Sequence, residues 1–310
     1  MLDSGPLIIA SPLATDEACF SVPAVRALHF AQPNRPLTIL CPEEQAEIWK
    51  TVTGITEVIP HSASASARKI AKLIGDFSQS LAWEDSAAAA AFTRKGITKR
   101  IGPSLDKLQK QLSNPVEIHQ RSGPVEHRVN DYLMLAEKLG TQPYDAINFQ
   151  PAPRPALLTQ LRIGVVPGSD YGSSAEWPLE RFRELINYRA AEYLIFDAPG
   201  RPAAAKKLSD LGQVVRNEDA LRELVSCHLV IASDGSIPHL AAHLGTPCVI
   251  IFGPNEPAWK RPLGTIHRVV HERVACSSCF LDKCPLDHRC LNEISVGQVN
   301  AELEALLSGS

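Results

Sequence analysis

The segment from Leu229 to Pro257, LVIASDGSIPHLAAHLGTPCVIIFGPNEP, constrains the fold of this chain more than any other stretch. Two β-branched apolar runs, 229–232 and 249–252, have the pattern of buried strands, and residues 237–244 between them have that of a helix. The loop 233–236 joins the first strand to this helix, and we expect its amides to be free. Free amides at the start of a helix carry partial positive charge, so the loop predicts a binding site for a phosphate or pyrophosphate.

The residues expected to bind that anion are Asp234, Gly235 and Ser236, because the glycine allows close approach of the backbone. The pattern leaves an alternative open, in which Asp234 or Ser236 only caps the helix. A second loop of the same kind, residues 166–178 with the sequence VPGSDYGSSAEWP, follows an apolar strand and ends with a proline at a helix start. Both loops follow strands of the same half, so one diphosphate could lie between them. In this second loop we expect Trp177 to be a hydrophobic anchor for its helix.

Strand-like and helix-like segments alternate through most of the chain. In the first half, strands are expected at 7–10, 37–40 and 56–59, with helices at 18–30 and 43–51. In the second half, strands are expected at 163–166, 193–196, 214–215, 229–232 and 249–252, with helices at 179–188, 203–211, 219–227 and 237–244. Alternation of this kind predicts an α/β protein with two doubly wound parallel sheets, each covered by helices on both faces.

A proline-rich stretch separates the two halves. Residues 148–160, NFQPAPRPALLTQ, contain three prolines, which cannot join a strand ladder or a helix interior. We therefore expect two Rossmann-like domains, 1–155 and 156–310, with ligands bound in a cleft at the carboxyl ends of both sheets.

Charge and hydropathy limit the kind of partner. The 310 residues carry a formal net charge of −3, which gives no concentrated basic footprint for nucleic acid and favours a small-molecule ligand. No apolar run approaches the roughly 18 residues of a membrane span, and the opening residues lack the basic start of a signal peptide. We expect a cytoplasmic protein.

The eight cysteines form two groups. Four are scattered through apolar elements, as buried thiols usually are: Cys19, Cys41, Cys227 and Cys248. The others cluster with a histidine in CSSCFLDKCPLDHRC: Cys276, Cys279, Cys284, Cys290 and His288. Their spacing is not that of a paired zinc ribbon, so a packed loop without metal is favoured over structural zinc.

A locally basic stretch lies in the first half of this mildly acidic chain: Arg94, Lys95, Lys99, Arg100, Lys107 and Lys110. Such a stretch suits a phosphorylated and carboxylated ligand. A solvated helix face explains the same pattern nearly as well.

Several segments together carry a family resemblance: LIIASPLATDEACFSVPAVRAL, AFTRKGITKRIG, PGSDYGSSAEWPLERFREL, SDGSIPHLAAHLGTPCVIIFGPNEP and CSSCFLDKCPLDHRCL. In order and spacing they resemble the ADP-heptose:lipopolysaccharide heptosyltransferases, glycosyltransferase family 9. The glycine-to-tryptophan spacing is most similar to the heptosyltransferase II branch of that family. No single motif decides the resemblance, which covers nearly the whole chain.

The resemblance implies a GT-B fold with two Rossmann-like domains facing a central cleft. It implies an ADP-heptose donor held by the C-terminal domain and a lipid A core glycolipid acceptor met by the N-terminal domain, with peripheral contact to the inner membrane. It also implies inversion at the anomeric carbon without a metal ion or other cofactor. A carboxylate would accept the proton of the acceptor hydroxyl, and helix amides would stabilise the leaving diphosphate.

Counting back from Pro23, the family's base aspartate falls on Glu17, which makes Glu17 the candidate base and its neighbour Asp16 the rival. The alternative is that both acids favour the positive start of the first helix. The family's donor-binding positions fall on Gly168, Ser169, Ser173, Ser174, Asp234, Gly235, Ser236 and His239. In the basic stretch, Lys99 and Arg100 are the candidates for acceptor binding.

Three positions depart from the family pattern. Ala175 stands where a lysine is expected, Ala14 replaces a hydroxyl residue, and the acid that reads the nucleoside has no equivalent near Gly200 other than Asp197. These departures leave a second hypothesis open, a sugar-nucleotide-binding protein with an altered donor or without turnover. A GT-B sugar-nucleotide epimerase is disfavoured, because the opening strand and the cysteine-rich tail look like the heptosyltransferases.

Overall fold

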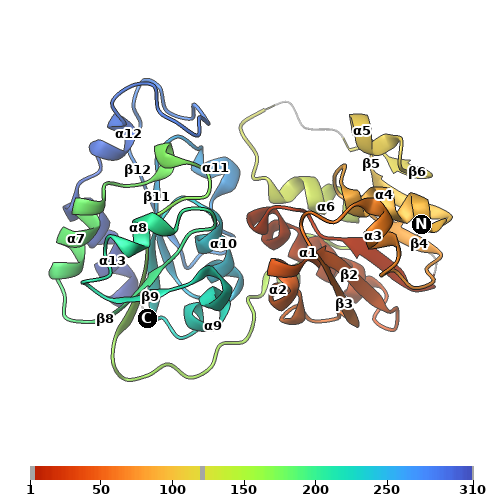
Figure 1. Ribbon diagram of the computed structural model, residues 1–310, viewed down its shortest axis with the longest axis horizontal. Helices are drawn as coiled ribbons and strands as arrows, with labels where there is room; N and C mark the ends of the chain where they lie inside the picture. Colours follow the sequence, from red (N-terminus) through yellow and green to blue (C-terminus); the bar gives the residue numbers. More distant parts are fainter. Residues whose placement is uncertain (1–3, 119–122, 309–310) are drawn as a thin grey trace. The chain divides into compact units, whose positions relative to one another are not determined.

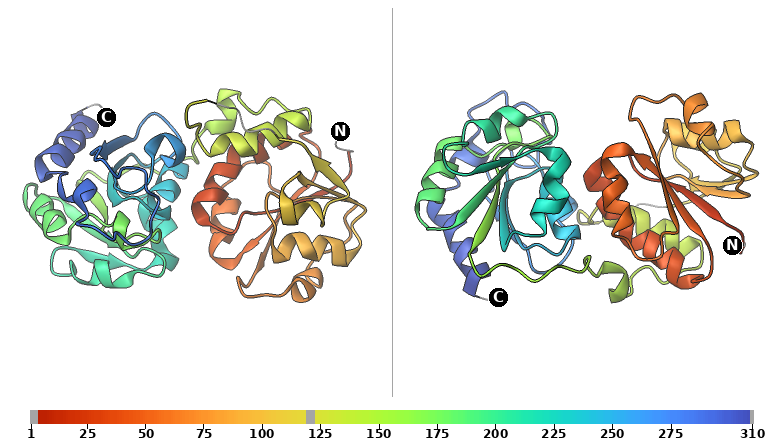
Figure 2. Two further views of the ribbon diagram at one scale, coloured as in Figure 1. Left: turned by 90° about the horizontal axis from the view of Figure 1, so that it is seen from above. Right: turned by 60° about the horizontal axis from the view of Figure 1, so that its bottom comes forward.

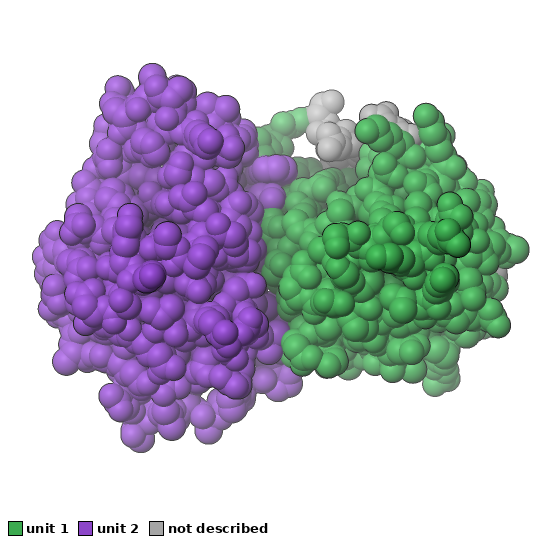
Figure 3. All heavy atoms as spheres, viewed as in Figure 1, with its two compact units in different colours: residues 1–150 green, residues 151–310 purple. Residues whose placement is uncertain are grey.

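The computed structural model describes residues 4–118 and 123–308. The chain divides into two compact units, residues 1–150 and 151–310 (Figure 3). Each unit contains one six-stranded sheet, and every pairing of its strands is parallel. The two parallel sheets predicted from the alternation of elements are therefore confirmed.

The first sheet has the order β3-β2-β1-β4-β5-β6 (Figure 1). Its strands are β1 (Leu7–Ala10), β2 (Leu37–Pro42), β3 (Glu57–His61), β4 (Gln79–Leu81), β5 (Lys99–Pro103) and β6 (Asn114–Val116). Its helices are α1 (Thr15–Ala31), α2 (Ala46–Lys50), α3 (Ala67–Ala71), α4 (Ala87–Lys95), α5 (Asp106–Gln109) and α6 (Val129–Lys138). The central strand β1 is buried along its whole length, as a parallel strand covered on both faces must be.

Helices cover both faces of this sheet. Apolar side chains of α3 and α4, among them Ile70 and Phe92, pack in one core with Ile8 and Leu40 from the strands. Helices α1 and α6 pack against each other. This pairing brings the first turn of α1 and the first turn of α6 into contact.

The second sheet has the order β12-β11-β10-β7-β8-β9. Its strands are β7 (Arg162–Val166), β8 (Glu192–Phe196), β9 (Gln213–Val215), β10 (Leu229–Ser233), β11 (Cys248–Phe252) and β12 (Arg268–His271). Its helices are α7 (Leu179–Asn187), α8 (Pro202–Lys206), α9 (Ala220–Leu224), α10 (Ser236–His243), α11 (Pro257–Lys260), α12 (Arg289–Asn292) and α13 (Val296–Ser308). Figure 2 shows helices on both faces of this sheet from two further views.

An apolar core cluster of the second unit lies under α7, α8, α12 and α13. Trp177 is fully buried there, packs edge-on against Phe182 at 4.9 Å between ring centroids, and donates from Nε1 to the carbonyl of Ile294 at 3.1 Å. Trp177 therefore anchors the start of α7 to the turn before α13, as the sequence predicts.

Several elements differ from those expected. Helix α1 begins at Thr15 rather than Ala18, which places both Asp16 and Glu17 in its first turn. The segment expected as a helix at 203–211 is helical only over α8, and the strands β4, β5, β6 and β12 have no counterpart among the predicted ones. These strands are short, and β5 and β6 carry prolines, so they lack the apolar pattern that identifies a buried strand. Among the described residues, no helix combines the length and apolar character that a membrane crossing requires.

Candidate functional site

Each sheet has one place where the strand order reverses. The neighbours there are β1 and β4 in the first unit and β7 and β10 in the second. The loops at the carboxyl ends of such strands diverge, and ligands of open α/β sheets bind in the resulting crevice. Asp16 and Glu17 lie at the start of the helix that follows β1, and five of the predicted donor-binding residues come soon after β7 or β10: Gly168, Ser169, Asp234, Gly235 and Ser236.

Glu17 lies just after β1, in the first turn of α1. Its carboxylate accepts two hydrogen bonds from Arg128 Nε, at 3.1 Å to each oxygen, and one from the phenol of Tyr132 at 2.5 Å to Oε2. Its side chain is 13% exposed, whereas Asp16 is 1% exposed. Of the two candidate bases, Glu17 thus retains the greater access to solvent and is fixed in position by two side chains from the start of α6.

Arg128 connects Glu17 to a further carboxylate, because its Nη1 donates to Asp131. Burial lowers the pKa of the Arg128 guanidinium, but the charge of Glu17 and the hydrogen bonds to it favour the cation, and the net shift is upward. Burial, and then the charge of Glu17, raise the pKa of Tyr132 well above its ordinary value. Tyr132 therefore remains a protonated donor to Glu17, and Arg128 remains a cation, throughout the physiological range.

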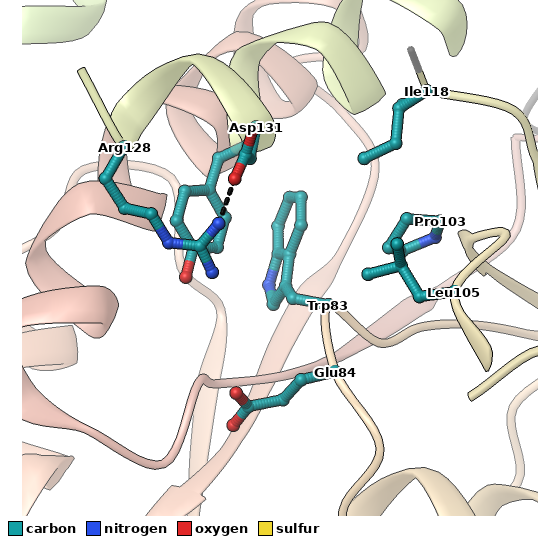
Figure 4. Close-up of a pocket in the computed structure, with 8 residues that line it drawn as sticks. Trp83, Glu84, Pro103, Leu105, Ile118, Arg128 and Asp131 are labelled. Atoms are coloured by element: carbon teal, nitrogen blue, oxygen red, sulfur yellow. Dashed lines mark hydrogen bonds and ion pairs between the residues drawn. The ribbon is translucent and has the colours of Figure 1, made fainter. Parts of the chain in front are cut away.

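A pocket of about 430 Å³ adjoins this group. It is lined by Trp83, Glu84, Pro103, Leu105, Ile118, Arg128, Asp131 and Tyr132 (Figure 4). In Figure 4 the indole of Trp83 stands between Arg128 and Pro103, and its ring packs edge-on against Tyr132 at 5.2 Å. An aromatic wall beside charged and hydrogen-bonding groups is a surface suited to a polar ligand with apolar faces, such as a sugar.

Glu84 follows β4 and faces the same pocket (Figure 4). Its Oε1 accepts a hydrogen bond from the amide of Leu13 at 2.8 Å, which ties the loop after β4 to the loop after β1. Burial raises the pKa of Glu84, the Leu13 amide opposes that shift, and the nearby charge of Glu17 adds to it. The place where the strand order reverses, between β1 and β4, therefore has the carboxylates of Glu17 and Glu84 nearby, in different environments.

Lys99 and Arg100, the candidates for acceptor binding, do not line this pocket. Both begin β5, whose opposite end, Pro103, does line it. The guanidinium of Arg100 donates to the backbone carbonyls of Gln111 and Ile97. The alternative of a solvated helix face is wrong for these two residues, because they lie in a strand and are half-buried.

In the second unit the two predicted anion loops meet where the strand order reverses, between β7 and β10. Ser169 Oγ donates to the carbonyl of Asp234 at 2.5 Å, and the carboxylate of Asp234 accepts from Asn255 Nδ2 at 2.6 Å. Gly168 is buried beside them. The structure therefore brings Gly168, Ser169 and Asp234 together with Gly235 and Ser236, which follow Asp234 directly.

The expectation of free amides in this loop is wrong for Ser236, whose amide donates to Asp170 Oδ1 at 2.8 Å. The capping alternative also needs correction. The N-cap position of α10 is Gly235, which has no side chain to cap with. The carboxylate bonded to the helix start comes from the other loop, which sequence spacing alone could not reveal.

The other predicted donor residues lie apart from this contact. Ser174 donates to the carbonyl of Leu281, and its amide donates to that of Asp282 at 3.2 Å, so it ties its loop to the cysteine-rich segment. Its neighbour Ser173 begins the same short 3-10 turn. His239 is buried within α10. Ala175, at the family's lysine position, is fully buried, so a lysine there would have to bury its ammonium group.

Asp197 directly follows β8, the strand next to β7. Burial raises the pKa of its carboxyl group, and Oδ1 is buried without a hydrogen-bond partner among the described residues. Asp197 Oδ1 lies after the carboxyl end of a strand, near the anion loops, and can accept a hydrogen bond from a ligand hydroxyl.

All eight cysteines are free thiols. Cys290 is buried, and burial, followed by the charges of Cys276, Cys279 and Cys284, raises its pKa. Within the described ranges, no three histidine, cysteine or acidic side chains are grouped as a metal site would require.

Sequence reasoning missed Arg128, Tyr132, Trp83 and Glu84. Tyr132 belongs to α6 and Arg128 is its N-cap residue. The buried residues of α6 recur at helical spacing, so its pattern VNDYLMLAEK could have identified the helix. The other two follow β4, a strand of three residues with only one apolar side chain. The sequence of β4 has no apolar strand pattern, because neighbouring elements bury the strand and its own side chains need not be apolar.

A family model described as "Glycosyltransferase family 9 (heptosyltransferase)" matches residues 216–289. Segments of 162 and 161 residues are 28% and 26% identical to the lipopolysaccharide heptosyltransferase 2 of Salmonella typhimurium and of Escherichia coli. Each alignment covers 47% of this chain, with 47% and 46% of the relative, so the similarity spans about half the length of these curated proteins.

Solved structures match almost the whole chain. Escherichia coli ADP-heptose lipopolysaccharide heptosyltransferase II superposes with a TM-score of 0.79 at 19% identity, covering 98% of this chain and 99% of that one. A glycosyltransferase family 9 protein from Veillonella parvula reaches 0.83 at 17% identity, covering 100% and 99%. The Escherichia coli heptosyltransferase WaaC with ADP reaches 0.75 at 17% identity, covering 97% and 99%.

These similarities, with the two doubly wound parallel sheets, place the chain in the GT-B fold class, as predicted. The family model and the aligned relatives add a narrower similarity. Over these segments the chain is similar to the glycosyltransferase family 9 heptosyltransferases, in agreement with the family resemblance of its motifs.

Proposed function

We propose that the chain is an inverting, metal-independent glycosyltransferase that moves a heptose from ADP-heptose to an inner-core acceptor of lipopolysaccharide. The observation that carries the proposal is the Glu17 carboxylate, held by Arg128 and Tyr132 at the carboxyl end of β1 beside the pocket. A general base needs a fixed carboxylate within reach of the hydroxyl that it deprotonates.

In the proposed reaction the acceptor hydroxyl oxygen attacks the anomeric carbon of the donor on the face opposite the diphosphate. The new glycosidic bond forms as the bond to the diphosphate breaks, so the configuration inverts. The hydroxyl proton passes to Glu17, and the bonding electrons leave with ADP. Tyr132 and Arg128, which line the pocket, hold the Glu17 carboxylate in one orientation beside it.

The second unit is proposed to hold the donor, with the diphosphate between the loops of Ser169 and Ser236. Ser173, Ser174 and His239 remain donor-site proposals on the family resemblance, and Asp197 becomes the proposed contact for a ribose hydroxyl because its buried Oδ1 lacks a partner among the described residues.

The first unit is proposed to hold the acceptor, with its pocket binding the sugar nearest the reacting hydroxyl. Such an acceptor is anchored in a membrane, so we infer that the chain acts at the cytoplasmic face of the inner membrane through peripheral contact. Lys99 and Arg100, at the other end of β5, would then meet only a distant part of the acceptor.

The test is Glu17→Gln, assayed with ADP-heptose and a deacylated core acceptor, with the product followed by mass spectrometry. An amide cannot take the proton, so turnover should fall roughly a hundredfold or more while ADP affinity and thermal stability are kept. The matched control is Glu47→Gln, which makes the same change on an exposed glutamate of α2 and should leave turnover unaltered.

Undiminished turnover in Glu17→Gln would remove Glu17 as the base, and parallel loss in Asp16→Asn would transfer the role to Asp16. The second candidate function, sugar-nucleotide binding without turnover, is favoured by the buried Ala175 at the family's lysine position. ADP binding without transfer to any core acceptor would establish that alternative.

A further inference from the structure

The first amide of α10 is already occupied by a carboxylate of the chain itself. Asp170 Oδ1 accepts from the Ser236 amide at 2.8 Å. Gly235 permits this approach, since a Cβ at that position would lie 2.8 Å from the same oxygen. The start of an eight-residue helix favours an anion, and here the anion is Asp170.

The amide of Ser169, in the facing loop, is engaged in the same way. It donates to Glu176 Oε1 at 3.3 Å, and Glu176 is held by Arg201 at 2.8 and 3.0 Å. One backbone donor from each anion loop is therefore directed at an internal carboxylate. An incoming diphosphate would meet two negative charges at these donors.

One donor at the helix start is still available. The hydroxyl of Ser236 is 1% exposed and has no hydrogen-bond partner among the described residues. Buried hydroxyls are normally paired, so this orphan indicates an acceptor that is not part of the chain. Asp170 itself is exposed, and Gly172, two residues on, has a φ of +116°, so the residue that covers the helix start belongs to a surface loop.

We propose that Asp170 substitutes internally for a donor phosphate, and that a nucleoside diphosphate binds this loop only by displacing the Asp170 carboxylate from the Ser236 amide. The inference rests on the proposed function, since it concerns the same donor site. It makes Asp170 a specificity residue, because weakly charged ligands cannot compete with a tethered carboxylate whereas a diphosphate can. After displacement, the Ser236 amide and hydroxyl both donate to the phosphate.

The test is calorimetric titration of ADP into the full chain and its Asp170→Asn and Asp170→Ala variants at low ionic strength. Asp170→Asn removes the charge but keeps an oxygen that can accept from Ser236, so the fold is preserved. Asp170→Ala frees the amide entirely. The matched control is Asp210→Asn, which removes a charge of the same sign from the exposed Arg183–Asp210 pair of the same unit.

Both Asp170 variants should bind ADP about tenfold more tightly than the unaltered chain, as expected for removal of a like charge beside a charge-assisted hydrogen bond, while the control should not. Equal or weaker binding by a folded Asp170→Asn variant would overturn the inference. If the unaltered chain also transfers heptose, that result leaves the proposed function intact. If no variant binds ADP and no transfer is seen, the inference and the proposed function both fall.

Discussion

The phenol of Tyr132 donates to Glu17 Oε2 at 2.5 Å, across a sequence separation of 115 residues. The same tyrosine ring lies 5.7 Å from the guanidinium carbon of Arg128, which binds both oxygens of the Glu17 carboxylate. The orientation of the candidate base is therefore set by the start of α6, not by its own helix.

Tyr132→Phe should lower kcat while leaving KM within a small factor. The substitution removes the phenol that fixes Glu17 but keeps the ring that packs against Trp83. A hydrogen bond to a charged group contributes about 1.5–3 kcal/mol, so turnover should fall between about tenfold and a hundredfold if the bond acts mainly on the reacting geometry. Steady-state kinetics on the heptosyl transfer measures both constants.

Tyr193→Phe is the matched control, because Tyr193 also donates its phenol, to the carbonyl of Arg189, but lies in the second unit. A Tyr132→Phe protein with unchanged kcat would show that Arg128 alone positions the carboxylate. A rise in KM without a fall in kcat would instead assign Tyr132 to acceptor binding.

Glu84→Gln should stabilise the protein at neutral pH more than at acidic pH. Burial raises the pKa of Glu84, so the folded protein binds this proton more tightly than the unfolded chain does. Stability is then lost as the pH rises from about 4.3, the ordinary value for glutamate, through the raised pKa. Glutamine carries no charge and keeps an oxygen to accept from Leu13, so it avoids that loss.

Melting temperatures of the two proteins between pH 4 and pH 8 provide the measurement. The difference between Glu84→Gln and the unaltered chain should become more positive as the pH rises. The exposed Glu47→Gln variant serves as the control and should show little trend. A constant difference for Glu84→Gln across the range would mean that burial does not penalise this carboxylate.

Trp177→Ala should cost about 3–5 kcal/mol of unfolding free energy, the usual range for truncating a fully buried aromatic side chain. Trp177 packs against Phe182 and bonds to the carbonyl of Ile294, so its loss opens a cavity between α7 and the turn before α13. Urea denaturation followed by circular dichroism measures the change.

Trp259→Ala is the matched control, since Trp259 is only half-buried and packs edge-on against the exposed Phe280. Trp259→Ala should lower the unfolding free energy by clearly less than Trp177→Ala. An equal loss of unfolding free energy in the two variants would contradict the role of Trp177 as the anchor of α7.

Local patterns predicted the parts of this protein that are continuous in sequence. The apolar strands β1, β7, β10 and β11 and the helix α10 follow from hydrophobic periodicity, since a buried strand or helix needs those side chains to cover its own backbone. The parallel sheets follow from the alternation of these elements. The choice of Glu17 as candidate base follows from the family resemblance, through its spacing from Pro23.

Tertiary structure alone decided what surrounds these residues. Short strands such as β4 form because their neighbours bury them, and β4 is what brings Glu84 beside Leu13. Packing of α6 on α1 supplies Arg128 and Tyr132 to Glu17, and the approach of two loops supplies Asp170 to Ser236. Such contacts join residues far apart in the chain, and their free energy depends on distance and burial in the folded state, which no local pattern encodes.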